Sequence, residues 1–169
     1  GADYAHQDEA PTLYVGSSLL VGIDTNIGTT PVTRLRTLEE AARRLVETGG
    51  TIRISGGIAI DADITLPDWG NNTITFTSDE TYHDSNGAVT TGLLIKKMDV
   101  ELKLGGKAIF DDILFKANDA DNYRIIISAN WHDIEMRYVR AQNNARCYLL
   151  AGTYSERSTS ENLDKKITT

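Results

Sequence analysis

The sequence has few of the residues that form cross-links or aromatic clusters. Its only cysteine among 169 residues is Cys147, which excludes an intrachain disulfide and a multi-cysteine zinc site. Aromatic residues make up only 7% of the chain, so the core is expected to be aliphatic. No apolar run approaches the roughly 20 residues that a membrane-spanning helix requires. The fold must therefore be stabilised by packed aliphatic side chains.

Acidic residues outnumber basic ones in this chain. The formal net charge is -7, whereas nucleic acids and anionic membranes are bound by basic surfaces. Both are therefore unfavourable partners, and an acidic polysaccharide would be repelled unless calcium or a local basic patch intervened. With 40% apolar and 24% charged residues, the composition is that of a globular domain and not of a disordered chain.

One helix is predicted, over residues 37–48. Thr37 stands at the N-cap position and Glu40 three residues later, which is the pattern of a capping box. Apolar residues follow at helical spacing and form one stripe, and Gly49 and Gly50 provide the stop. The stripe consists of Leu38, Ala41, Ala42, Leu45 and Val46.

After Gly50 the apolar period changes from helical to alternating, which predicts a series of short strands separated by turns rich in Gly, Asn and Asp. Apolar positions recur at intervals near 22 residues, for example Ile52 and Ile74, Ile54 and Phe76, and Ile127 and Leu149. Such a spacing fits one turn of a parallel β-helix with about three strands per turn. An antiparallel sandwich is the alternative, but it predicts strands 8–12 residues apart without matching at the longer interval.

Three segments carry a resemblance to a known family. They read Gly49-Gly50-Thr51-Ile52-Arg53-Ile54 after the helix, and Asp63-Ile64-Thr65-Leu66-Pro67 followed by Asn72-Thr73-Ile74-Thr75-Phe76. Over about residues 13–155 this order resembles the N-terminal coils of the pectate-lyase-like right-handed parallel β-helix superfamily. Its composition and its turns are similar to those of surface or cellulosome-associated proteins of gut and rumen Firmicutes. The resemblance implies an all-β solenoid of about five coils with one N-terminal capping helix, in an extracellular or cell-surface bacterial protein.

Three segments are expected along the chain: a flexible leader over 1–12, the β-helix domain over 13–155, and a polar tail over 156–169. No second amphipathic segment follows the last predicted coil. We therefore expect the chain to be part of a longer protein, with its final coil covered by the tail or by a partner. If another copy is that partner, a homodimer would form through Tyr148, Leu149 and Leu150.

The candidate ligand-binding residues are those suited to sugars. Trp69 lies at a predicted turn tip, where an exposed indole could stack on a sugar ring, or else fold back over the coil. Tyr82 and His83 lie in the polar segment 78–87 and could offer a similar platform. Arg124 and Arg137 fall on neighbouring predicted coils and could meet a glycan carboxylate, unless nearby acids pair with them.

The candidate metal ligands are Asp79, Glu80 and Asp84, in the same polar segment. They lack a complete calcium ligand set, so we expect no required cofactor and calcium binding no tighter than millimolar. A solvated loop is the simpler interpretation of this segment.

No complete catalytic constellation is present. The only acidic doublet, Asp111-Asp112, lacks the partner motifs of a polysaccharide lyase or glycoside hydrolase, and Asp133 and Glu135 could at most extend a carboxylate stripe. The sequence therefore favours a non-catalytic module that binds carbohydrate or serves as a structural or adhesive part of a larger secreted protein. The alternative is the N-terminal portion of a polysaccharide lyase or glycoside hydrolase whose catalytic residues lie beyond residue 169.

Overall fold

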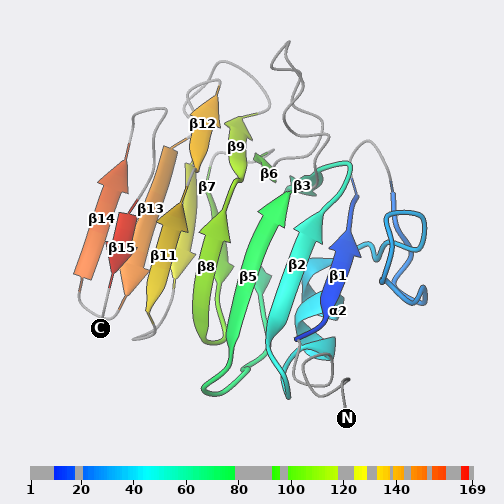
Figure 1. Cartoon of the computed structure of the whole chain (residues 1–169). Coiled ribbons are helices and arrows are strands. Elements are labelled where there is room, and N and C mark those ends of the chain that lie inside the picture. Colours follow the sequence, from blue (N-terminus) through cyan, green and yellow to red (C-terminus); the bar gives the residue numbers. More distant parts are fainter. Residues whose placement is uncertain are drawn as a thin grey trace.

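The computed structural model describes residues 10–17, 21–78, 93–95, 99–117, 124–128, 133–137, 139–142, 146–151, 154–158 and 165–167. These residues form one helix and a series of short strands (Figure 1). In chain order the elements are β1 (Thr12–Val15), α2 (Leu38–Arg44), β2 (Gly50–Ile54), β3 (Ile58–Ile60), β4 (Ile64–Thr65), β5 (Thr73–Ser78), β6 (Leu93–Ile95), β7 (Asp99–Lys103), β8 (Lys107–Asp111), β9 (Leu114–Ala117), β10 (Arg124–Ser128), β11 (Ile134–Arg137), β12 (Arg140–Gln142), β13 (Arg146–Ala151), β14 (Tyr154–Ser158) and β15 (Lys165–Ile167).

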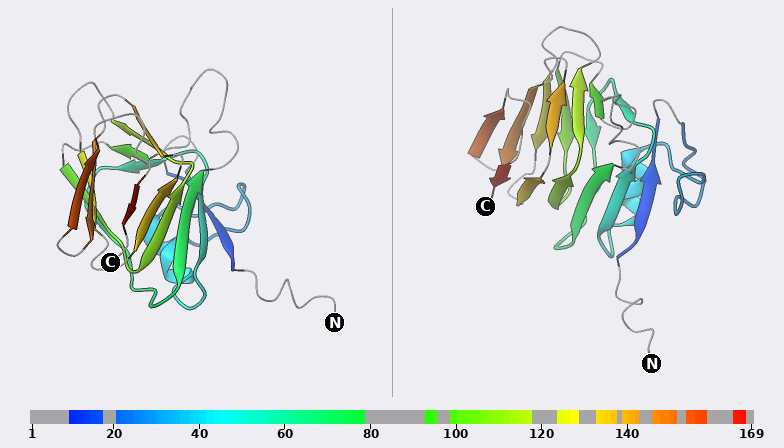
Figure 2. Two further views of the ribbon diagram at one scale, coloured as in Figure 1. Left: turned by 60° about the vertical axis from the view of Figure 1, so that its left-hand side comes forward. Right: turned by 45° about the horizontal axis from the view of Figure 1, so that its top comes forward.

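The strands belong to three sheets. A six-stranded sheet has the order β1-β2-β5-β8-β11-β15, a five-stranded sheet the order β14-β13-β10-β7-β4, and a four-stranded sheet the order β12-β9-β6-β3. Successive strands go to different sheets: β2, β3 and β4 lie in three different ones, and β5 returns to the first beside β2. Neighbours within each sheet are parallel apart from the last pairs, β13–β14 and β11–β15, which are antiparallel. Figure 2 shows β1 at one end of the molecule and β14 and β15 at the other.

The predicted fold class, an all-β right-handed parallel β-helix of about five coils, is contradicted. The structure is mixed: it has sheets of parallel strands, one helix and antiparallel strands at its C-terminal end. A closed solenoid is not established by the described residues, because the segments that connect β5 to β6, β9 to β10 and β12 to β13 lie outside them.

The regular period is also wrong as a general rule. Ile127 does pair with Leu149, as predicted. However, Ile52 pairs with Phe76 and not with Ile74, and Phe76 pairs with Phe110. The distance along the sequence between paired residues therefore varies from strand to strand, because the connections differ in length. A fixed period of 22 residues ignores these differences. It therefore pairs Ile52 with Ile74, whereas the observed partner, Phe76, lies two residues further along the chain.

The core lies inside these sheets and is mainly aliphatic, as the composition predicts. Alternation along each strand sends one set of side chains inward, and the pairing aligns these sets from strand to strand. One inward row contains Leu13, Ile52, Phe76, Phe110 and Met136, all buried. Within it the rings of Phe76 and Phe110 stack, with centroids 4.8 Å apart and planes 10° apart.

Helix α2 packs against β1 and β2 and lies behind them in Figure 1. Thr37 is its N-cap, as predicted, and the Thr37 hydroxyl accepts a hydrogen bond from the Glu40 backbone N–H at 3.2 Å. The helix is shorter than predicted and ends at Arg44, with Gly49 in a left-handed conformation at φ 68°. Leu38, Ala41 and Ala42 are its buried residues, so the predicted stripe faces the core.

The capping box is only half formed. The Glu40 carboxylate does not reach back to the N-cap; it accepts hydrogen bonds from Arg43 at 2.6 and 2.7 Å and from Arg44 at 3.2 Å. The Thr37 backbone N–H instead donates to the Asp24 carboxylate at 2.9 Å. Asp24, from the preceding loop, thus takes the place that Glu40 was predicted to fill.

At the C-terminal end, residues 156–158 and 165–167 of the expected polar tail lie in β14 and β15, which pair with β13 and β11. Of the two expected coverings, the tail or a partner, the tail is the one observed at these strands. The edge of β13 at Tyr148, Leu149 and Leu150 is thus occupied by residues 155–157 of the same chain. The free edge that motivated a homodimer through these three residues is therefore not available there.

Replacing Glu40 by Gln should destabilise the protein in a pH-dependent way. The hydrogen bond from Arg43 outweighs partial desolvation and, together with Arg44, lowers the pKa of Glu40 from 4.5 to about 2. Because the folded-state pKa is depressed, the stabilisation is fully present above pH 4.5 and is lost as the pH falls from there through 2. Thermal unfolding should show Glu40→Gln less stable by about 0.5–1 kcal/mol at pH 7, with the difference vanishing near pH 2. A difference that does not change with pH would contradict the ionic origin of this effect.

Candidate functional site

The six-stranded sheet presents an outward face on which the pairing aligns polar side chains. The register pairs Tyr14 with Arg53, Arg53 with Thr77, Thr77 with Asp111, and Asp111 with Arg137. These residues alternate with the buried inward rows, so they form one straight row across β1, β2, β5, β8 and β11. All are half-buried except Arg137, which is exposed.

A sixth residue extends this row beyond β1. Leu35 forms a parallel bridge with Val15, which places Arg34 beside Tyr14. The Leu35 N–H also donates to the Tyr14 carbonyl at 2.7 Å. We call Arg34, Tyr14, Arg53, Thr77, Asp111 and Arg137 the outer row. With neighbouring strands about 4.8 Å apart, six positions span roughly 24 Å.

A second outward row runs parallel to the first. It consists of Thr12, Thr51, Thr75, Ile109 and Glu135, of which Thr12 is exposed and the others are half-buried. Three neighbouring strands thus each carry a threonine here. Glu135 lies 3.6 Å from Arg137, two residues along the same strand, so this acid is paired with a cation.

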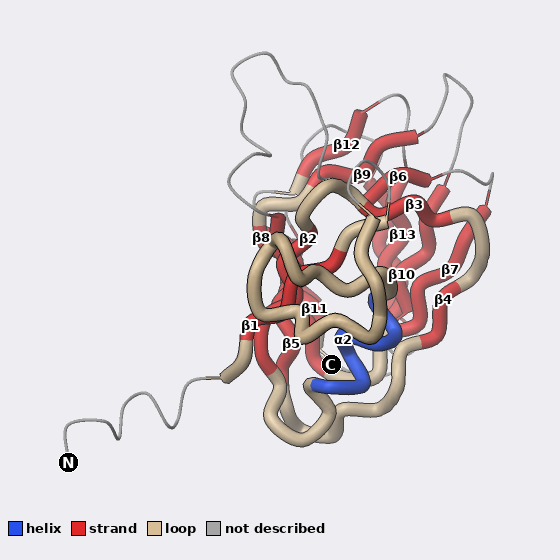
Figure 3. The backbone as a smooth tube through the Cα atoms, turned by 90° about the vertical axis from the view of Figure 1, so that its right-hand side faces the viewer, coloured by secondary structure: helices blue, strands red, loops and turns tan. Residues whose placement is uncertain are grey.

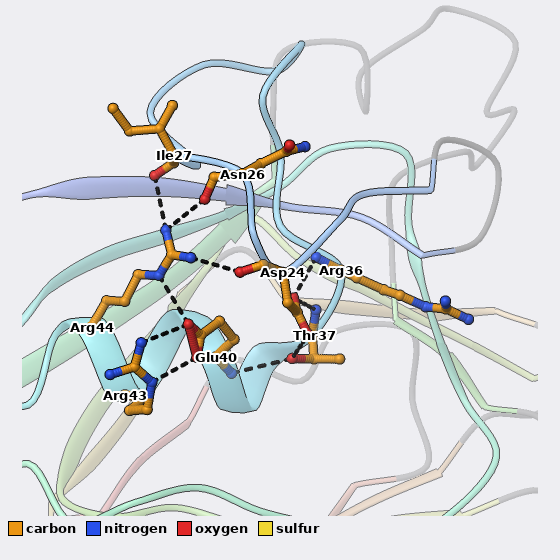
Figure 4. A network of polar contacts seen from close by, with 8 residues as sticks. All are labelled: Asp24, Asn26, Ile27, Arg36, Thr37, Glu40, Arg43 and Arg44. Atoms are coloured by element: carbon orange, nitrogen blue, oxygen red, sulfur yellow. Dashed lines mark hydrogen bonds and ion pairs between the residues drawn. The ribbon is translucent and has the colours of Figure 1, made fainter.

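The loop 21–36 determines where Arg34 lies. Its contacts to α2 are drawn in Figure 4: Arg44 donates to the carbonyl oxygens of Asp24 at 2.7 Å, Asn26 at 2.8 Å and Ile27 at 3.1 Å. The Asp24 carboxylate in turn accepts from the backbone N–H groups of Arg36 and Thr37. The loop is therefore fastened to the helix at both of its ends, beside β1. Figure 3 shows this end of the molecule with α2 close by.

The carbonyl of Arg34 is fixed as well. It accepts hydrogen bonds from the Asn26 amide at 3.0 Å and from the Ile23 N–H at 3.1 Å. The guanidinium of Arg34 then extends along the sheet and donates to the Ser55 hydroxyl at 3.3 Å. The helix-capping network thus fixes one end of the outer row.

A cleft of about 320 Å³ lies elsewhere, between the start of α2 and the segment from β3 to β4. Its charged lining residues are Arg36, Glu39, Asp61 and Asp63. Asp63 is engaged, since its carboxylate accepts from the Glu101 backbone N–H at 2.9 Å. The cleft therefore combines both signs of charge without a convergent set of catalytic groups.

Trp69 is not the exposed platform that the sequence suggested. Its side chain is 1% exposed and belongs to the core, and its indole N–H donates to the Lys107 carbonyl at 3.0 Å. Of the two predicted positions, the one folded back over the sheet is the observed one. Trp69 packs against Gly106, where a methyl group would collide with the indole ring. A buried tryptophan cannot stack on a sugar, so this expectation is corrected.

The other predicted site residues are not brought together. Arg137 lies in the six-stranded sheet, whereas Arg124 belongs to β10 in the five-stranded sheet, so the two are not neighbours on one face. Tyr82, His83, Asp79, Glu80 and Asp84 lie outside the described residues. Among the residues that are described, no group of three or more His, Cys, Asp or Glu side chains is placed to hold a metal.

Sequence reasoning missed Arg34, Tyr14 and Arg53 as members of a common site. Alternation within β2 indicated that Arg53 faces outward, but nothing in the sequence aligned it with Arg34 and Tyr14. The pairing of residues distant along the chain creates that row.

Comparison with family models, curated proteins and solved structures found no match for this chain. The resemblance to the pectate-lyase-like superfamily therefore stays a hypothesis. No helix within the described part of the chain is long and apolar enough to cross a membrane.

Replacing Gly106 by Ala should destabilise the protein through Trp69. The added methyl group would collide with the indole, and relieving that overlap should cost about 1–3 kcal/mol. Urea denaturation followed by circular dichroism would measure the loss. In a Trp131→Phe background, the fluorescence emission of Trp69 should also shift to the red.

The control is Gly70→Ala, where a methyl group meets no atom within 4 Å but the backbone is left-handed at φ 62°. It should cost only the local backbone strain, about 1–2 kcal/mol, without moving the Trp69 emission. If Gly106→Ala left both stability and emission unchanged, Trp69 would not be packed as described.

Proposed function

We propose that this chain is a non-catalytic module of an extracellular bacterial surface protein and that it binds an extended glycan along the outer row. The observation that carries the proposal is the straight alignment of an aromatic ring, guanidinium groups, a hydroxyl and a carboxylate on one sheet face. Tyr and Arg are among the residues enriched at protein–protein interfaces. A row of roughly 24 Å is long enough for several sugar units.

The shape of the face also suits a polymer. The positions of the outer row and of the second row follow one another at the strand spacing, so a chain laid across the strands would meet one side chain of each row per strand. Hydroxyl, carboxylate and guanidinium side chains provide both acceptors and donors for sugar hydroxyls. The extracellular location and the larger parent protein are part of this proposal and rest on the sequence resemblance.

A structural or adhesive role is the second form of the same proposal. It would use the sheets as a rigid stalk and need no glycan. A homodimer through the C-terminal strands is less favoured, because β14 already pairs with β13. Measuring glycan binding distinguishes the two roles directly.

Replacing Tyr14 by Ala should weaken glycan binding. A glycan array would first identify a ligand, and titration calorimetry would then compare the variants. An aromatic contact contributes about 0.5–1.5 kcal/mol, so a loss of several-fold to about tenfold in affinity is expected. The control is Lys103→Ala, an exposed change on β7 in the five-stranded sheet, which should leave binding unchanged. Binding that is insensitive to Tyr14→Ala would place the ligand elsewhere.

The chain by itself should release no product from polysaccharides. In the described residues the two rows contain only two acids, Asp111 and Glu135, and Glu135 lies beside Arg137. Incubation with pectate, alginate, xylan and cellulose should yield neither unsaturated products nor reducing ends above background. Activity abolished by Asp111→Asn would instead support the alternative, a part of a polysaccharide lyase or glycoside hydrolase.

A further inference from the structure

Two arginines of the outer row reach toward the same end of β2. Arg34 donates from Nη2 to the Ser55 hydroxyl at 3.3 Å, and Arg53 donates from Nη1 to the Ser78 carbonyl at 3.5 Å. Ser55 comes two residues after Arg53, and Ser78 pairs with Ile54, the residue between them. Both guanidinium groups therefore lie at the carboxyl ends of the paired strands β2 and β5.

Neither guanidinium has an acidic partner among the described residues. Each makes the single long hydrogen bond given above, although a guanidinium carries five N–H donors. The Nε atoms of both side chains are buried and make no hydrogen bond. They are the two buried side-chain polar atoms of the described residues that lack a partner.

Two arginines of the neighbouring helix behave differently. Arg43 and Arg44 share the Glu40 carboxylate, and Arg44 also donates to three carbonyl groups. Arg36 is exposed, so water can solvate its guanidinium, whereas the Nε atoms of Arg34 and Arg53 are buried. Arg34 and Arg53 occupy the positions on either side of Tyr14 in the outer row.

Two half-buried cations near each other carry an electrostatic cost that an anion would remove. Water screens such a pair incompletely when the side chains are partly buried, and each unused N–H gains most from a charged acceptor. The geometry points to an anion-binding site formed by Arg34 and Arg53, which we propose takes one carboxylate or sulfate group. Tyr14, between them, would contact the body of the molecule that carries this group.

The site explains how a chain of net charge -7 could bind an anionic group at all. Long-range attraction to a polyanion is absent, so binding depends on the local contact and on the paired N–H donors of the guanidinium fork. This inference names the chemistry of one part of the proposed glycan-binding row, but the anion site itself does not depend on a polymer. A group on a polysaccharide and a free small anion share that chemistry, and the experiment separates them.

The first measurement is an NMR titration with sodium acetate and with sodium sulfate, at ionic strength kept constant with sodium chloride. The arginine Nε–Hε signals of Arg34 and Arg53 should shift with a common dissociation constant, while those of Arg43 and Arg44 should not. Arg53→Gln should abolish the shift at Arg34. Lys103→Gln removes the same charge from an exposed position and should change nothing. Shifts spread evenly over all arginines, or none at all, would overturn the site.

The second measurement compares carboxymethylcellulose with hydroxyethylcellulose, which share a backbone and differ in charge. Affinity electrophoresis should give an affinity for the carboxylated polymer at least tenfold higher than for the neutral one. The reason is that a hydrogen bond between charged groups changes affinity by about tenfold or more. Arg53→Gln should remove that difference. The variants Arg34→Lys and Arg53→Lys keep the charge but lose the fork, so they should bind more weakly yet remain folded by near-ultraviolet circular dichroism.

The NMR titration and the polymer electrophoresis distinguish the anion site from the glycan function. If acetate shifts the two signals but neither polymer is retarded, the anion site stands for a small anion and the glycan function fails. If the neutral polymer binds as well as the charged one and Arg53→Gln has no effect, the glycan row stands and the anion site is wrong.

Discussion

Parallel strands paired in register are the constraint on which the rest of this structure depends. Each pairing places like positions side by side, so a side chain that alternation directs inward meets inward side chains from the next strand. Leu13, Ile52, Phe76, Phe110 and Met136 are aligned in this way, although they come from widely separated parts of the sequence. The same alignment on the opposite face produces the outer row. Core and candidate site are therefore two consequences of one set of backbone hydrogen bonds.

The first strand would leave this sheet with an open edge, and the chain closes it with its own loop. Leu35 bridges to Val15, and the fastening of loop 21–36 to α2 holds that bridge in place. Unpaired edges invite association with other chains, and natural proteins cover them. Here Arg44 and Asp24 supply the cover by connecting the loop to the helix. At the other end β14 and β15 add antiparallel strands to the five- and six-stranded sheets.

The outer row places arginines in half-buried positions, where a charged side chain needs a partner. Alternation demands a polar residue at Arg53, and stability favours a partner for every half-buried charge. Glu40 satisfies Arg43 and Arg44 in this way, and Glu135 satisfies Arg137. Within the described part of the chain, the Arg34 and Arg53 guanidinium groups hydrogen-bond only to neutral serine groups, and their Nε atoms make no hydrogen bond. Because guanidinium N–H groups form their strongest hydrogen bonds with charged acceptors, an anion would gain most at this end of the sheet.

The sequence by itself determined the features that depend on near neighbours: the Thr37 cap, the buried stripe of α2, the alternation of the strands and the aliphatic core. It also gave one correct register, Ile127 with Leu149, where a short connection keeps the period near the assumed value. Elsewhere connections of unequal length shift the pairing, and a fixed period cannot follow them. Only the tertiary structure decided that Trp69 is buried, that the last strands are antiparallel, and that Arg34, Tyr14 and Arg53 share one row. These facts depend on contacts between residues far apart in sequence, which local patterns do not encode.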